Sequence, residues 1–229
     1  MRSRTILVTA IIVFLNTVNG CCQPFSVDAH TLFLCHFDTT LTADFARGSK
    51  DPVSGNAALL VEEGKWGAAL FAGKNAIVPS KPLQDASLER KPFMGLQYPT
   101  EGNLNPAIGT VEMWVKPFFP TDTPGTTNTY SLFSSNADTG ASRILLGLIS
   151  KDGRRGVVLT MNFEEKGIKE YGITDYGVDF QPGQWHHIAF TWNGETLALW
   201  IDGNQRAQRQ IPISFPCGRL FSLGGVGYK

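Results

Sequence analysis

Two turn motifs near the C-terminal end of the chain constrain its fold more than any other sequence feature. Asn193-Gly194 and Asp202-Gly203 interrupt an aromatic and apolar stretch over residues 185–211, and both dipeptides readily adopt the positive φ angles that tight hairpin turns require. Between them, residues 197–201 (LALWI) place Leu, Leu and Ile on one face and Ala and Trp on the other, which is the period-two pattern of a strand. The stretch therefore predicts a three-stranded antiparallel meander.

Short apolar runs separated by Gly, Pro and Asn turns also occur upstream, and no segment has a convincing helical pattern. The further strands expected are Leu32–Phe37, Ala68–Phe71, Ala76–Val78, Val111–Lys116, Tyr130–Ser134, Ile144–Ile149 and Gly156–Phe163. Many short strands with such turns predict an all-β fold, a two-sheet antiparallel jelly-roll sandwich. One segment departs from this pattern, because Ser80–Ala107 carries four prolines and is too long for an ordinary connection. It is expected to be either a functional loop or a solvated insertion.

The composition excludes two classes of protein. Hydrophobic residues make up 42% of the chain, and 20 Lys and Arg balance 20 Asp and Glu. A disordered chain has fewer apolar residues and a larger net charge. A nucleic-acid-binding protein usually has a basic excess to place against phosphates, so no nucleic-acid partner is expected.

The first twenty residues have the order of a secretory signal peptide. Arg2 and Arg4 precede an apolar run over Ile6–Leu15, and small or modest residues precede Cys21. The apolar run is shorter than the roughly 20 residues that span a bilayer as a helix; an uncleaved N-terminal anchor is the alternative. We therefore expect an exported protein, with a signal peptide at 1–20, a linker at 21–30 and one domain at 31–229. Val-Asn-Gly before Cys21 also resembles a bacterial lipoprotein cleavage box, so plain secretion and a lipid anchor at Cys21 both remain open.

Outside the cytosol disulfides can persist, and the chain has four cysteines. Cys21 and Cys22 are adjacent and are not expected to bond to each other. A Cys35–Cys217 bond would close a long loop between an early and a late strand. The alternative is that Cys35 is a small buried hydrophobic residue.

Four motifs in order resemble the LamG-like jelly-roll domains of the concanavalin A-like lectin/glucanase superfamily. They are HFD (36–38), GKWGAALFAG (64–73), GTVEMWVKP (109–117) and the pair QWHHIAFTWNG (184–194) with LALWIDGN (197–204). The resemblance runs from about residue 31 to 225 and implies a concanavalin A-like sandwich, an architecture that carries lectins, adhesion modules and glycosidases alike. The closing strand usual in that family is not found, so we expect either a C-terminally incomplete chain or a sheet that lacks an edge strand.

The sequence lacks a recognisable set of catalytic residues. Retaining glycosidases need two carboxyl groups about 5 Å apart, which on a strand requires acids two positions apart. Glu62-Glu63 and Glu164-Glu165 are adjacent pairs, and Glu112 stands among apolar residues, where it is expected to pair with Lys116 or with a neighbouring strand. His186 and His187 should face opposite ways and are expected to be structural.

Binding is the better-supported class of function. Trp200 and Trp114 oppose the apolar face of their strands and should point outward, where aromatic rings can stack on sugars; Tyr171 and Tyr176, in a Gly-rich stretch expected to be a loop, are further candidates. The alternative is that these aromatic residues only pack beneath a loop. The expected ligand is a glycan or an extracellular protein, with a glycoside hydrolase or a structural adhesion segment of a larger envelope protein as the alternatives.

Calcium is the remaining cofactor to consider, because the resemblance implies that some relatives bind it at the sandwich edge. Asp38 and Asp44 could supply hard oxygen ligands. The alternative is that Asp44 fixes a turn.

Overall fold

The computed structural model describes residues 25–56, 59–61, 64–71, 95–117, 127–136, 142–163, 168–210 and 217–224. These ranges contain strands and no helix. The strands are β1 (Phe33–Leu34), β2 (Phe45–Ala46), β3 (Ser54–Asn56), β4 (Leu59–Val61), β5 (Ala69–Phe71), β6 (Gly95–Pro99), β7 (Gly109–Val115), β8 (Thr127–Asn136), β9 (Ser142–Lys151), β10 (Arg154–Phe163), β11 (Ile168–Asp175), β12 (His186–Trp192), β13 (Thr196–Ile201), β14 (Asn204–Gln210) and β15 (Leu220–Gly224). Within the described ranges, therefore, no helix has the length and apolar character needed to cross a membrane.

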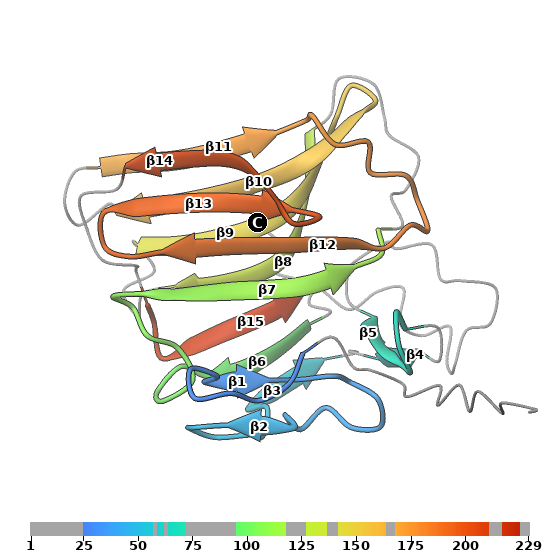
Figure 1. The fold of residues 1–229 in the computed structure, drawn as a ribbon, viewed down its shortest axis with the longest axis vertical. Coiled ribbons are helices and arrows are strands. Elements are labelled where there is room, and N and C mark those ends of the chain that lie inside the picture. The colour runs from blue at the N-terminus through green and yellow to red at the C-terminus, as the bar shows by residue number, and fades with distance from the viewer. Residues whose placement is uncertain are drawn as a thin grey trace, which may run out of the picture.

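Two antiparallel sheets form the two layers of the molecule (Figure 1). The larger has seven strands in the order β11-β10-β9-β8-β15-β6-β3, and the smaller has four in the order β14-β13-β12-β7. Two short pairs, β1-β2 and β4-β5, are additional to these layers. The arrangement confirms the all-β, two-sheet jelly-roll sandwich predicted from the sequence.

The core lies between the two sheets, because each strand turns alternate apolar residues inward. Leu197, Leu199 and Ile201 of β13 are at most 1% exposed, as the predicted alternation requires. The largest fully buried side chains are Tyr98, Phe133, Phe180, Phe190, Leu96, Ile144, Leu146, Leu159, Met161, Ile188, Leu197 and Leu199.

The turns of the predicted meander differ from each other. Asp202 and Gly203 both have positive φ angles (49° and 76°), as a two-residue hairpin turn of the mirror-image class requires. The connection at Asn193 is longer and spans residues 193–195. Asn193 Oδ1 accepts hydrogen bonds from the backbone N–H groups of Glu195 and Thr196, so the Asn side chain shapes this loop.

Four expectations about strands need correction. The run Leu32–Phe37 forms only the two-residue β1, because Phe37 adopts a positive φ of 62°. The strand expected at Tyr130–Ser134 extends over all of β8. Part of the expected long loop Ser80–Ala107 is β6, which lies inside the larger sheet between β15 and β3. The stretch that contains Tyr171 is not a loop but the edge strand β11.

Several other expectations fall on residues outside the described ranges. They are the signal peptide at 1–20, Cys21 with its lipid anchor, the strand at Ala76–Val78, and the two adjacent glutamate pairs.

The edge strands β11 and β14 join the two sheets along one side of the sandwich (Figure 1). Arg206 Nε donates to Asp175 Oδ2 at 2.7 Å, and Arg209 donates to the carbonyl of Gly172 at 2.6 Å. Polar side chains therefore bridge the layers where the apolar core ends.

Candidate functional site

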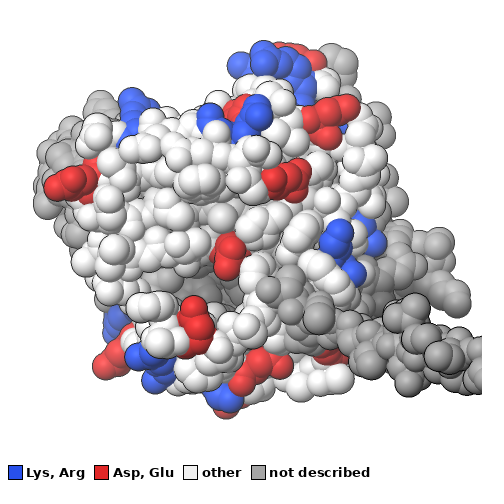
Figure 2. All heavy atoms as spheres, viewed as in Figure 1, with Lys and Arg blue, Asp and Glu red and all other residues white. Residues whose placement is uncertain are grey.

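The outer face of the four-stranded sheet carries both tryptophans that the sequence indicated. Directly paired residues of antiparallel strands share a face, and the register places twelve outward residues together. We call this surface the outer face; its residues are Thr110, Glu112, Trp114, His187, Ala189, Thr191, Thr196, Ala198, Trp200, Gln205, Gln208 and Gln210. Figure 2 shows mainly uncharged surface over these strands, with acidic atoms in its middle and the Lys and Arg atoms nearer its margins.

Trp200 lies in the middle of a polar but uncharged part of this face. Its indole Nε1–H donates to Thr191 Oγ1 at 3.5 Å, and its strand neighbours are Ala189 on one side and Gln205 on the other. Gln205 Nε2 in turn donates to Gln208 Oε1 at 2.9 Å. Among the described residues, no aromatic ring or cation stacks on the Trp200 indole, so the ring is only partly covered.

Trp114, by contrast, is enclosed by neighbours. The edge of Trp66 meets it at 5.2 Å between centroids, His187 lies tilted at 5.3 Å, and the ammonium group of Lys65 lies 4.6 Å from its centroid. These contacts occupy much of the ring, as the packing alternative expected. Of the two tryptophans, Trp200 is the better placed to meet a ligand.

Glu112, on the edge strand β7, and His187, near the start of β12, form a pair on the outer face. His187 Nε2 lies 3.2 Å from Glu112 Oε2, so Glu112 has the partner on a neighbouring strand that the sequence led us to expect. Glycosidases require a second carboxyl group about 5–9.5 Å from the first. Among the described outward residues of the four strands, no second carboxylate stands beside Glu112.

The adjacent histidines serve different contacts because their side chains leave opposite faces of β12. His186 points inward, is 9% exposed, and has Nδ1 at 2.8 Å from Asp202 Oδ2. The other oxygen of Asp202 accepts the backbone N–H of His187, also at 2.8 Å. Asp202 therefore connects the turn after β13 to the start of β12 by hydrogen bonds. These bonds give the WHH residues of β12 and the IDG residues of the turn a structural role.

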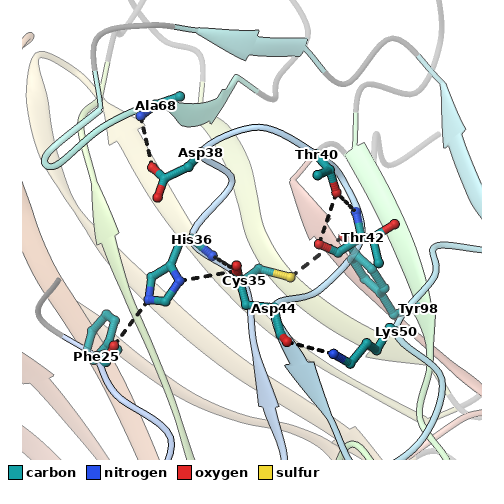
Figure 3. Close-up of polar contacts among 10 residues, drawn as sticks. All are labelled: Phe25, Cys35, His36, Asp38, Thr40, Thr42, Asp44, Lys50, Ala68 and Tyr98. Atoms are coloured by element: carbon teal, nitrogen blue, oxygen red, sulfur yellow. Dashed lines mark hydrogen bonds and ion pairs between the residues drawn. The ribbon is translucent and has the colours of Figure 1, made fainter.

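The two candidate calcium ligands are each engaged within the protein (Figure 3). Asp38 Oδ1 accepts the N–H of Ala68 at 3.1 Å, beside Gly67, whose φ of 64° brings its Cα close to that carboxylate. Asp44 Oδ2 accepts the backbone N–H of His36 at 2.7 Å. This bond joins Asp44 to the backbone eight residues earlier, and calcium binding by Asp38 and Asp44 stays a prediction. In the described ranges, no three His, Cys, Asp or Glu residues are grouped as a metal site.

The disulfide expected between Cys35 and Cys217 is not formed in the structure, in which both are free, half-buried thiols. Cys35 Sγ donates instead to Tyr98 Oη at 3.9 Å. Burial raises the pKa of Cys35 to about 12 despite this hydrogen bond, and burial also raises the pKa of Cys217. Both cysteines are partly buried and pack against the hydrophobic core.

The two tyrosines do not join the tryptophans. Tyr176 follows β11 at the side of the sandwich where Asp175 meets Arg206, and the guanidinium of Arg154 lies 4.5 Å from its ring centroid. Tyr171 is on β11, paired with Met161 of the larger sheet. The predicted ligand aromatics thus belong to two different regions.

Sequence reasoning missed Lys65, Trp66, Gln205 and Gln208. The first two belong to the GKWGAAL motif, and only the fold brings that motif beside Trp114. The two glutamines share a face despite a spacing of three residues, because the pairing of β13 with β14 shifts between Leu199 and Trp200.

A two-sheet sandwich with these motifs defines a jelly-roll domain of the concanavalin A type. The model of the Laminin_G_3 family, described as the concanavalin A-like lectin/glucanases superfamily, matches residues 94–225. The chain belongs to this family.

One solved structure shares the fold, and a second is reported for its similarity alone. Domain 4 of AbnA, an extracellular GH43 arabinanase from Geobacillus stearothermophilus, is 18% identical with a TM-score of 0.57, over 87% of this chain and 84% of that one. The LG4-5 domains of the mouse laminin alpha1 chain are 12% identical with a TM-score of 0.45, over 59% of this chain. This chain spans 33% of that laminin fragment. No curated protein matches the chain by sequence.

Proposed function

We propose that this protein is an exported, non-catalytic recognition module that binds a glycan on its outer face. The observation that carries the proposal is the half-buried indole of Trp200, on which no described ring or cation stacks, beside a hydrogen-bonded pair of glutamines. Ligand sites commonly combine an aromatic surface with a few polar groups that fix orientation.

The neighbours of Trp200 suit a hydroxyl-rich, uncharged ligand. Ala189 and Ala198, which share this face with the indole, are short and almost fully buried. Gln205, Gln208 and Thr191 together offer amide and hydroxyl groups that can both donate and accept hydrogen bonds. A sugar ring has the same combination of apolar C–H faces and hydroxyl edges.

The comparisons support the same class of ligand. The Geobacillus domain that shares the fold was solved in complex with arabinotriose. The signal-like order of residues 1–20 supports export. The alternative is that the same face binds an extracellular protein, and the test must distinguish this from glycan binding.

The test is a glycan array followed by affinity measurement on three proteins: the original chain, Trp200→Ala and Tyr176→Ala. Removal of a central aromatic anchor costs about 2 kcal/mol or more, or roughly a 30-fold rise in Kd. Tyr176→Ala is the matched control, because this aromatic residue lies at the side of the sandwich against Arg154. Repeating the array with calcium and with a chelator tests the calcium hypothesis.

Three outcomes would contradict the proposal. The original protein could bind no glycan, which would favour a protein partner or a structural role. It could bind one with the same affinity after Trp200→Ala. It could also release reducing sugar in a reaction that Glu112→Gln abolishes, which would favour a glycoside hydrolase.

A further inference from the structure

Among the twelve residues of the outer face, Glu112 is the only Asp, Glu, Lys or Arg. Two arginines belong to β14, but both of them bond to β11 at the side of the sandwich. Arg206 donates to the carboxylate of Asp175, and Arg209 donates to the carbonyl oxygen of Gly172. The formal charge of the outer face is therefore negative, and Figure 2 shows acidic atoms in the middle of the surface over these strands.

Glu112 and Trp200 lie in one row that crosses three strands of the smaller sheet. Ala189 of β12 pairs with Trp200 on one side and with Glu112 on the other. Because neighbouring strands lie slightly under 5 Å apart, the Cα atoms of Glu112 and Trp200 are about 10 Å apart. The residue between them is an alanine that is 5% exposed, so a sugar that stacks on the indole has the carboxylate at its side.

The carboxylate of Glu112 has capacity to accept hydrogen bonds from a ligand. Its side chain is 44% exposed, and its Oε2 lies 3.2 Å from His187 Nε2. Among the described residues, the Glu112 side chain has no other polar contact. An ionised carboxylate accepts about four hydrogen bonds and donates none. Glu112 can therefore bind hydroxyl or ammonium groups, whereas another carboxylate or a sulfate offers it only acceptors.

Lys65 brings a positive charge to this face from a separate segment, beside Trp114. Its ammonium group lies 4.6 Å from the ring centroid of Trp114 and 5.5 Å from that of Trp66. Trp114 belongs to the next row of paired residues, beyond Glu112. The ammonium group is thus engaged by two indoles, and among the described residues no such cation stacks on Trp200. A ligand on Trp200 therefore has a carboxylate in its own row and no basic residue there.

We propose that Glu112 determines the charge specificity of the outer face, which binds neutral or amino-substituted glycans and rejects glycans that carry carboxylate or sulfate groups. This inference rests on the proposed binding of a glycan against Trp200 and adds the class of glycan. A neutral sugar donates hydroxyl hydrogen bonds to the carboxylate, and an amino sugar adds an attraction between opposite charges. An acidic sugar brings a like charge close to Glu112, and such repulsion is a common source of specificity.

The test compares glycans that differ only in the charge at one carbon atom. Tetrasaccharides of glucose, of galactose and of mannose are prepared with each hydroxymethyl group intact, converted to an aminomethyl group or oxidised to a carboxylate. The Kd of each form is measured for the full chain at neutral pH and low salt. We expect the carboxylate form to bind about tenfold more weakly than the neutral form, and the amino form at least as tightly. This preference should shrink in high salt, because salt screens exposed charges.

Three variants identify the group that is responsible. Glu112→Gln removes the charge at nearly constant size, so the neutral and carboxylate forms should then bind with Kd values within about twofold of each other. Glu112→Asp keeps the charge and should keep the order of affinities, which also decides the question if Glu112→Gln does not fold. Lys65→Gln is the matched control, because it removes the positive charge beside Trp114 and should not weaken the preference for the neutral form.

The same assay separates failure of this inference from failure of the proposed function. Trp200→Ala should raise the Kd of every form together, because it removes the shared stacking surface. If no form binds, or if all bind as well after Trp200→Ala, glycan binding on this face is wrong and the charge specificity is wrong with it. If binding depends on Trp200 but the carboxylate form binds as tightly as the neutral form, or the preference persists in Glu112→Gln, only the inference about Glu112 is overturned.

Discussion

Asp202 is the residue on which the start of β12 depends. It accepts hydrogen bonds from the His186 ring and from the His187 backbone, and it adopts a φ of 49° that Asp tolerates better than most residues. Removing the carboxylate leaves a buried imidazole and a backbone N–H without these partners. A single side chain thus joins the hairpin turn to the neighbouring strand.

We predict that Asp202→Ala lowers the free energy of unfolding more than Asp152→Ala does. Asp152 has a φ of 51° in the turn between β9 and β10, so both changes carry a similar backbone cost, and Asp152 also has an interaction of its own. The loss in Asp202→Ala is expected to be the larger by about 1–2 kcal/mol, because it removes the contacts with both histidines. Urea unfolding measures both variants, and a loss in Asp202→Ala no larger than that in Asp152→Ala would contradict this role of Asp202.

The edge strands β11 and β14 depend on a charged contact between the sheets. Burial raises the pKa of Asp175, but the hydrogen bonds from Arg206 and from the Gly177 N–H outweigh burial and hold that pKa below its ordinary value. A carboxyl group whose pKa is lower in the folded protein than in the unfolded chain stabilises the folded state. The stabilisation is complete at pH values above the pKa of the unfolded chain, and it is lost as the pH falls through the pKa of the folded protein.

We therefore predict that Arg206→Ala makes stability less dependent on pH below about pH 4. The urea midpoint of the original chain should fall on acidification, and the variant should start lower and fall less. Arg154→Ala is the control, since Arg154 stacks on the ring of Tyr176 and forms no ion pair with a carboxylate among the described residues. If the urea midpoints of the original chain and of Arg206→Ala fall equally on acidification, the contact between Arg206 and Asp175 does not cause the acid sensitivity.

Strands in which apolar and polar residues alternate clearly could be predicted from the sequence, whereas strands at the margins of the sheets could not. β13 alternates over its whole length between a buried and a less buried face, whereas among the side chains of β11 that the structure describes, only Ile173 belongs to the buried core. β6 does alternate, with Leu96 and Tyr98 buried on either side of Gln97, but the surrounding prolines concealed it. β1 is short because Phe37 leaves the extended region, which a run of apolar letters does not reveal.

At the scale of the whole molecule, the layer architecture followed from the sequence but the grouping of side chains did not. Which residues share a face depends on register, and the shift after Leu199 decides that Gln205 stands opposite Trp200. Trp66 reaches Trp114 from a separate segment, which no local pattern encodes. The sequence therefore predicted the two tryptophans and not their different surroundings.

The central claim is that a glycan binds against Trp200. The most direct measurement follows the indole N–H resonances of the five tryptophans while the tightest-binding glycan of the array is titrated into the protein. The account predicts that the Trp200 resonance shifts to saturation with the binding curve, while that of Trp192, buried and bonded to the Asn105 carbonyl, stays in place. Binding that saturates with the Trp200 resonance unmoved would contradict it.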